Sequence, residues 1–144
     1  MKRILTVCLG NICRSPLAEG ILQAEAQLLG IPVHVESAGT AGYHIGAQAD
    51  ARSIQVGRKH SVDISKHKAQ KFIPAFFDQF DLIVVMDKNN YRDVVAQAIS
   101  SEQRNKVKMY RPDEQDVDDP YWGTDADFET MYQVLKEHAT SHLQ

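Results

Sequence analysis

Two continuous apolar runs, residues 3–9 (RILTVCL) and 80–87 (FDLIVVMD), restrict the fold of this chain more than any other feature. Each run is predicted to be a buried strand, and a helical pattern follows each of them. Two shorter strands are predicted over residues 33–37 and 106–110, and helices over residues 15–30, 51–60, 89–99 and 125–143. Strands separated by helices form right-handed crossovers in a parallel sheet. The predicted α/β fold is a single domain, 1–144, with a doubly wound four-stranded parallel sheet and helices on both faces.

Charge and hydropathy narrow the class of partner. The formal net charge of -3 provides no basic field for nucleic acid. The apolar runs are far shorter than the roughly 20 residues that span a bilayer. No cleavage site follows the N-terminal basic residues, so a signal peptide is not expected. We therefore expect a cytoplasmic protein with reduced thiols, whose partner is neither nucleic acid nor a membrane.

The segment between the first predicted strand and the first helix, residues 7–20 (VCLGNICRSPLAEG), contains both cysteines of the chain. Ser15 is predicted to cap the helix, and Pro16 fits its first position. Ligands of doubly wound sheets bind beyond the carboxyl ends of the strands, where Cys8 lies. Backbone N–H groups and the helix dipole favour an anion there. The predicted anion-binding loop comprises Cys8, Leu9, Gly10, Asn11, Ile12, Cys13, Arg14 and Ser15.

The residue types in this loop fit phosphoryl transfer to sulfur. A cysteine among N–H dipoles and positive charge is stabilised as the thiolate, the nucleophilic form. Arg14 can hold two phosphate oxygens with parallel hydrogen bonds, which lysine cannot do. Ser15 can donate its hydroxyl to the Cys8 sulfur, and Asn11 tolerates a left-handed turn. The alternative interpretation is a buried strand cysteine beside a solvated arginine.

Three segments resemble the low-molecular-weight protein tyrosine phosphatase family in order and spacing: CLGNICRSP (8–16), ESAGT (36–40) and DPYWGTDADFETMYQ (119–133). The resemblance implies hydrolysis of phosphotyrosine through a phosphocysteine intermediate, without metal or cofactor. Cys8 resembles the nucleophile, Arg14 the phosphate clamp and Asp119 the general acid. The implied partner is a phosphotyrosine-containing protein, which for bacterial relatives is often an autophosphorylating tyrosine kinase.

The chemistry gives an independent reason to expect an acid such as Asp119. Expelling a phenolate of pKa about 10 is slow unless a proton arrives as the bond breaks. Pro120 favours an extended backbone at Asp119, and a bound phosphate dianion favours the protonated acid. The alternative is a solvated acid on the surface stretch DEQDVDDP (113–120), and Asp118 is the nearest rival for the role.

The resemblance also implies residues that support the loop, namely Ser37, His67 and Asp87. His67 alternatively belongs to a solvated basic run, residues 66–71, and Gln70 stands where the family often has arginine. Asp87 alternatively caps the following helix, and the two roles are compatible.

Aromatic residues are predicted to line a substrate slot that admits a phenyl ring and excludes shorter phosphoserine. The candidates are Tyr43, Tyr121 and Trp122, and the alternative is that these rings pack into the core or lie on the surface. Many relatives carry tyrosine at the position of Trp122, so regulation by phosphorylation there is not expected.

Cys13 has two interpretations, a small buried apolar residue or a partner that captures oxidised Cys8 in a reversible disulfide. His138 and His142, at i and i+4, are expected to lie in solvent because no third metal ligand accompanies them. Two further functions stay open. A thiol-dependent arsenate reductase uses a similar loop but needs cysteines outside it, and a non-enzymatic anion-binding module has no use for Asp119.

Overall fold

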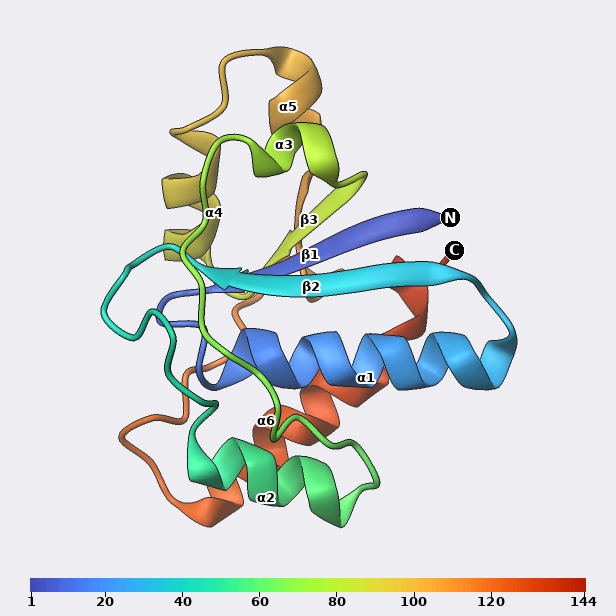
Figure 1. The fold of residues 1–144 in the computed structure, drawn as a ribbon, viewed down its shortest axis with the longest axis vertical. Helices are drawn as coiled ribbons and strands as arrows, with labels where there is room; N and C mark the ends of the chain where they lie inside the picture. Colours follow the sequence, from blue (N-terminus) through green and yellow to red (C-terminus); the bar gives the residue numbers. More distant parts are fainter.

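The computed structural model describes residues 1–144 and contains one parallel sheet with helices on both faces (Figure 1). The strand order is β2-β1-β3-β4. The strands are β1 (Lys2–Cys8), β2 (Val33–Gly39), β3 (Leu82–Val85) and β4 (Val107–Met109). The predicted doubly wound four-stranded fold is therefore confirmed.

Strand β1 lies at the centre of the sheet and determines where the loop after it is placed. It pairs in parallel with β2, from Lys2 opposite Val33 to Cys8 opposite Gly39, and with β3 on its other edge. Every residue of β1 from Ile4 to Cys8 is buried, as expected for a strand covered on both faces. Cys8 therefore lies at the carboxyl end of the central strand, inside the protein.

Helices cover the two faces of the sheet as two groups. Helices α1 (Arg14–Leu29), α2 (Ala51–Lys59) and α6 (Asp125–Glu137) lie together on one side in Figure 1. The short helices α3 (Phe76–Gln79), α4 (Lys88–Val95) and α5 (Ser101–Asn105) lie on the other. Separate clusters of buried side chains fill the two interfaces. Each fully buried Leu, Ile or Phe contributes about 1.5–3 kcal/mol of burial free energy to this arrangement.

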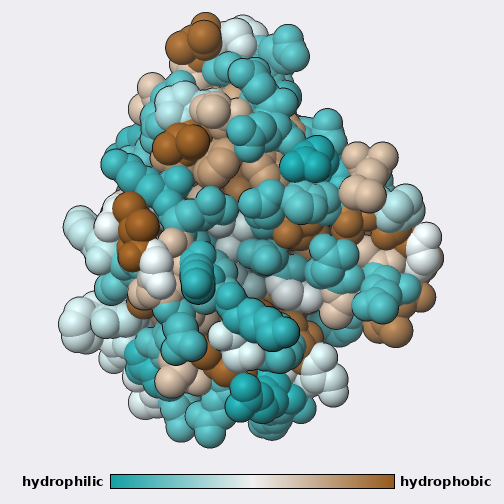
Figure 2. Space-filling model, viewed as in Figure 1, coloured by the Kyte–Doolittle hydropathy of each residue, from teal (hydrophilic) through white to brown (hydrophobic).

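The face of the molecule seen in Figure 2 shows no single broad apolar patch. In the view of Figure 2 it is largely hydrophilic, and hydrophobic residues appear in several separate groups. None of the helices combines the length and the apolar composition required to cross a membrane.

The structure differs from the predicted element boundaries at several points. Helix α1 begins at Arg14 with Cys13 as its N-cap, so Ser15 is inside the helix and does not cap it. Helices α3 and α5, of four and five residues, were not predicted because they are too short to show a helical period. The helix ends where it was predicted to end, with Gly30 as a left-handed C-cap at φ 69°.

The expectation that the closing helix ends in solvent is wrong. Helix α6 ends at Glu137, and the chain turns into η1 (Thr140–His142), which returns His142 to the protein interior. The His142 ring donates from Nε2 to the carbonyl oxygen of Tyr110 at 2.7 Å and packs against the Tyr110 ring. A carbonyl acceptor at the end of the sheet therefore anchors the C-terminal turn.

Because His142 is buried, we expect the free energy of unfolding to decrease in mild acid. Burial lowers the pKa of His142, and the nearby charges of Lys2 and His138 act in the same direction. Because the unfolded histidine, with a pKa near 6.5, binds a proton more readily, the free energy of unfolding should fall as pH drops below about 6.5. The slope is at most about 1.4 kcal/mol per pH unit for each such histidine.

Urea denaturation between pH 7.5 and 5.5 measures this effect. Burial also lowers the pKa of His67, so two histidines contribute in the same direction. His142→Asn should remove part of the dependence. Superimposable pH profiles for the native protein and this variant would contradict the assignment.

Candidate active site

The loop between β1 and α1 points its backbone N–H groups to one side and its carbonyl groups to the other. The carbonyl oxygens accept hydrogen bonds from surrounding segments: Thr40 to Cys8 at 2.9 Å, Ala41 to Leu9 at 2.9 Å and Asp50 to Ile12 at 2.8 Å. The N–H groups from Leu9 to Arg14 donate to no backbone acceptor. Successive N–H groups without a partner in the protein favour an anion, so anion binding by this loop stays the prediction made from the sequence.

Two positions explain how the backbone can turn so tightly here. Asn11 has φ 60°, the left-handed conformation that its side chain was predicted to tolerate. Gly39, opposite Cys8, leaves the loop room to approach, because a Cβ atom there would lie 2.7 Å from the carbonyl oxygen of Leu9. The turn therefore depends on a residue of the loop and on a glycine of the neighbouring strand.

The Cys8 sulfur lies at the base of this loop and has a hydroxyl beside it. Only 3% of Cys8 is exposed, and its Sγ atom lies 3.0 Å from Ser15 Oγ. Ser15 Oγ also accepts a hydrogen bond from Asn11 Nδ2 at 2.8 Å. The Ser15 hydroxyl has two neighbours to which it can donate its proton, the Cys8 sulfur and the Ala38 carbonyl oxygen, which is farther away at 3.4 Å. The predicted contact between Ser15 and Cys8 is present, from the first turn of α1.

A chain of polar side chains holds Asn11 in its left-handed conformation. Asn11 Nδ2 also donates to Ser37 Oγ at 3.0 Å, and Ser37 in turn donates to Glu19 at 2.7 Å. The Asn11 side-chain oxygen accepts from the Gln70 backbone at 2.9 Å, and its carbonyl oxygen accepts from His67 Nε2 at 2.7 Å. Ser37 and His67 therefore contact the loop, as predicted.

Glu19 is a member of this network that the sequence analysis missed as a site residue. It lies in the second turn of α1, and the desolvation that accompanies burial raises its pKa. Its bond from Ser37 orients that hydroxyl, which then presents a lone pair to Asn11. The sequence signal was weak, because a glutamate early in a helix is ordinary for helix stability alone.

Arg14 is buried with a guanidinium group fixed by two acceptors. Its Nη1 atom donates to Asp87 Oδ2 at 2.8 Å and to the carbonyl oxygen of Val117 at 2.8 Å. Arg14 is 2% exposed, so these interactions are little screened by solvent. Both hydrogen bonds use Nη1, so the N–H groups of Nη2 and Nε form no hydrogen bond within the protein.

Asp87 combines the two interpretations that the sequence left open. Its Oδ1 atom accepts from the Asn90 backbone at 2.7 Å and caps α4, while Oδ2 binds Arg14. The residue comes directly after the β3 strand and Met86, at the same edge of the sheet as Cys8. The sheet thus places Asp87, the carboxylate partner of the Arg14 guanidinium, beside the loop.

Asp119 reaches the same cavity from the segment before α6. Its Oδ2 atom lies 3.7 Å from Arg14 Nη2, and its Oδ1 atom accepts from the Tyr121 backbone at 3.1 Å. The side chain is 42% exposed and therefore accessible to a ligand and to water. Asp118, its rival, does not line the cavity.

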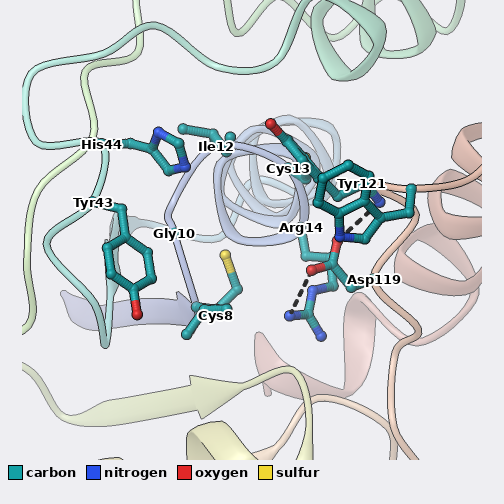
Figure 3. A pocket seen from close by; sticks show the side chains of 11 residues that line it. Cys8, Gly10, Ile12, Cys13, Arg14, Tyr43, His44, Asp119 and Tyr121 are labelled. Carbon is teal, nitrogen blue, oxygen red and sulfur yellow. Dashed lines mark hydrogen bonds and ion pairs between the residues drawn. The ribbon is translucent and has the colours of Figure 1, made fainter.

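The cavity above Cys8 has a volume of about 380 Å³ and aromatic walls. Figure 3 shows Tyr43 and His44 on one side of the Cys8 sulfur, and Tyr121 with Asp119 on the opposite side. Trp122 is 94% exposed and forms the outer rim, with its ring 4.9 Å from that of Tyr121. All three predicted aromatic residues line the cavity, and His44 is a wall residue that the sequence analysis missed.

Cys13, a residue of the loop itself, is buried and lines the same cavity. Burial raises the pKa of its thiol, and the neighbouring Asp50 carboxylate adds to the effect. Cys13 is thus protonated, and both cysteines are free thiols. Capture of oxidised Cys8 by Cys13 stays a prediction.

A parallel α/β domain whose central strand ends in an anion-binding loop, with a buried cysteine and arginine, has the architecture of a small phosphatase. The family model described as "Low molecular weight phosphotyrosine protein phosphatase" matches residues 3–144. The chain belongs to this family and is a protein phosphatase.

Individual relatives agree with this assignment. The human low molecular weight phosphotyrosine protein phosphatase is 38% identical over 145 residues, covering 92% of this chain and 87% of the human one. The structure of Vibrio vulnificus Wzb in complex with benzylphosphonate superimposes with a TM-score of 0.89 at 35% identity, covering 99% of this chain and 97% of the other. An Entamoeba histolytica protein tyrosine phosphatase gives a TM-score of 0.91 at 29% identity, covering 96% and 92%.

Proposed function

We propose that this protein hydrolyses phosphotyrosine monoesters through a phosphocysteine intermediate on Cys8, with Arg14 as the phosphate clamp and Asp119 as the general acid and base. The observation that carries the proposal is the orientation of the loop from Leu9 to Arg14. Its carbonyl groups are bonded to surrounding segments, and the N–H group of a trans peptide points away from the carbonyl group, so the N–H groups face away from those segments and stay available to a phosphate. Donors fixed in this way stabilise negative charge that develops on phosphate oxygens.

Binding would place the phosphate in the loop with its ester oxygen toward the cavity mouth. Arg14, already held by Asp87 and Val117, would offer Nη2 and Nε to two phosphate oxygens. The guanidinium therefore needs little reorganisation when the phosphate arrives. Phosphoryl transfer gains most from such fixed positive charge, because its transition state spreads charge over the equatorial oxygens.

In the first step the Cys8 thiolate forms a bond to phosphorus as the bond from phosphorus to the phenol oxygen breaks. Asp119 donates its proton to that oxygen, so tyrosine leaves as a neutral phenol. In the second step the Asp119 carboxylate takes a proton from water, the water oxygen bonds to phosphorus, and the sulfur leaves as a thiolate. The hydrogen bond from Ser15 stabilises this thiolate.

The depth of the cavity supports phosphotyrosine as the substrate. Cys8 lies at the buried base, while Tyr43, 77% exposed, and Trp122 stand at the rim. A phenyl ring spans this depth between the aromatic walls, whereas the short side chain of phosphoserine leaves its phosphate above the loop. The Wzb relative is in complex with benzylphosphonate, an aromatic phosphonate, which supports the same ligand shape.

The proposed partner is accordingly a protein that carries an accessible phosphotyrosine, and the family resemblance extends this to autophosphorylated bacterial tyrosine kinases. An arsenate reductase is disfavoured, because both cysteines of the chain lie in the loop and none is left outside it for a thiol relay.

Trapping the intermediate tests the proposal directly. The protein is mixed with a labelled aryl phosphate in the presence of a chelator, quenched in acid within milliseconds and digested for mass analysis. We expect the aryl phosphate to be hydrolysed in the presence of the chelator, and a phosphoryl group to be found on the peptide that contains Cys8. Turnover without any label on Cys8, or label on another residue, would contradict the mechanism.

A further inference from the structure

The segment that carries Asp119 is held at both ends by arginine side chains. At its start, the Val117 backbone donates to Met86 at 2.7 Å, and its carbonyl oxygen accepts from Arg14. At its end, the carbonyl oxygens of Tyr121 and Gly123 accept from Arg52, at 2.9 Å from Nη2 and 3.4 Å from Nη1. The position of Asp119 therefore depends on how firmly these two arginines hold the segment.

Arg52 is itself fixed by contacts on both sides of its guanidinium. Its Nε and Nη2 atoms donate to the two carboxylate oxygens of Asp50, at 3.1 Å and 3.0 Å. Its guanidinium also lies over the ring of Phe128, 4.4 Å from the centroid, and near the ring of Tyr121. A guanidinium group that is bound to a carboxylate and stacked on an aromatic ring is preorganised. It therefore loses little conformational entropy when it binds the two carbonyl groups.

The helix turn that carries Arg52 also contacts the phosphate loop. The Asp50 backbone donates to the Ile12 carbonyl oxygen at 2.8 Å, and Ser53 Oγ donates to the Cys13 carbonyl oxygen at 3.2 Å. The N-terminal turn of α2 thus binds the loop of Cys8 with its backbone and Ser53, and the segment of Asp119 with Arg52. It joins the two halves of the site by direct hydrogen bonds.

We propose that Arg52 is a positioning residue that sets the distance and direction of Asp119 relative to the phosphate loop. The inference rests on the proposed function, in which Asp119 protonates the leaving phenol. A general acid must come within hydrogen-bond reach of the leaving oxygen. A displacement of about 1 Å is enough to cost up to roughly 100-fold in rate. Arg52 does not line the cavity, and it acts through the segment that carries Asp119.

The test compares aryl phosphates that differ in the basicity of the leaving group. Arg52→Met retains the aliphatic stem that packs on Phe128 and removes the hydrogen-bond donors. We expect kcat/KM for phenyl phosphate, whose leaving group needs the acid, to fall about 10- to 100-fold. The value for para-nitrophenyl phosphate, whose leaving group is a weak base, should fall less than about twofold. Arg52→Lys, which can donate to one carbonyl group, should restore part of the loss.

Two controls separate positioning from stability. Arg58→Met changes an exposed arginine at the other end of α2 and should leave both substrates unaffected. Combining Arg52→Met with Asp119→Ala should produce no loss beyond that of Asp119→Ala, because the two residues act on one proton transfer. Equal losses on the two substrates, or fully additive losses in the double variant, would overturn the inference.

The same series distinguishes this inference from the function on which it rests. If Asp119→Ala shows no dependence on the leaving group, the proposed general acid is wrong, and the role of Arg52 falls with it. If Asp119→Ala shows the dependence and Arg52→Met does not, the proposed function stands, and the positioning role alone is overturned.

Discussion

Cys8→Ser should hydrolyse aryl phosphates on the order of 10⁴-fold or more slowly than the native protein. The serine hydroxyl is a far weaker nucleophile in the same place, because the proposed mechanism relies on the nucleophilicity of sulfur and includes no base that removes a hydroxyl proton. Cys13 should not replace the Cys8 sulfur, because burial and the Asp50 carboxylate raise the pKa of its thiol and keep it protonated.

Stopped assays with a chromogenic aryl phosphate measure the rate, and a thermal shift in inorganic phosphate provides the control. The variant retains the N–H groups and Arg14, so phosphate should still stabilise it against unfolding by mass action. Undiminished hydrolysis by a variant that binds phosphate normally would exclude sulfur as the nucleophile.

Asp119→Ala has the second largest expected effect, and its size should depend on the leaving group. For phenyl phosphate we expect kcat/KM to fall by 10² to 10⁴-fold, the usual contribution of general acid catalysis. For para-nitrophenyl phosphate the loss in kcat/KM should be much smaller, since that anion leaves without a proton. The loss in kcat should persist when hydrolysis of the intermediate limits turnover, because the carboxylate also activates water.

Asp118→Ala is the matched control, one residue earlier on the same segment. Asp118 is exposed and does not line the cavity, so this variant should keep the native rate on both substrates. If instead Asp118→Ala were the slower variant, the acid role would move to Asp118. The comparison also removes the general effect of deleting one negative charge near the cavity.

The sequence was sufficient to predict the sheet and the anion-binding loop because both depend on local patterns. The continuous apolar run before Cys8 indicated a strand buried on both faces, and the residues from Gly10 to Pro16 indicated a turn into a helix. Arg14 and Ser15 follow within one helical turn of that loop. Their proximity to Cys8 is therefore nearly fixed by chain geometry.

Residues brought together by tertiary packing were much harder to predict. Arg52 and the segment after Asp119 are separated by about half the chain, and their contact depends on how α2 packs against α6. Glu19 acts through Ser37, and no sequence spacing shows that hydrogen bond. His142 was misjudged because its position depends on a turn after α6 that has no regular period. The residues of the anion-binding loop could be predicted from the sequence, whereas the residues that hold the loop in place could be identified only from the structure.

The left-handed turn at Asn11 has a consequence for the thermodynamics of ligand capture. The unfavourable conformation is stabilised by hydrogen bonds to three residues, Ser37, His67 and Gln70, from two other segments of the protein, so its cost is met when the chain folds. A tetrahedral anion then binds to a preorganised loop, so little of its binding free energy is lost in rearranging the protein. The same rigidity does not distinguish an ester from free orthophosphate, so under the proposed mechanism we expect the enzyme to be inhibited by its own product.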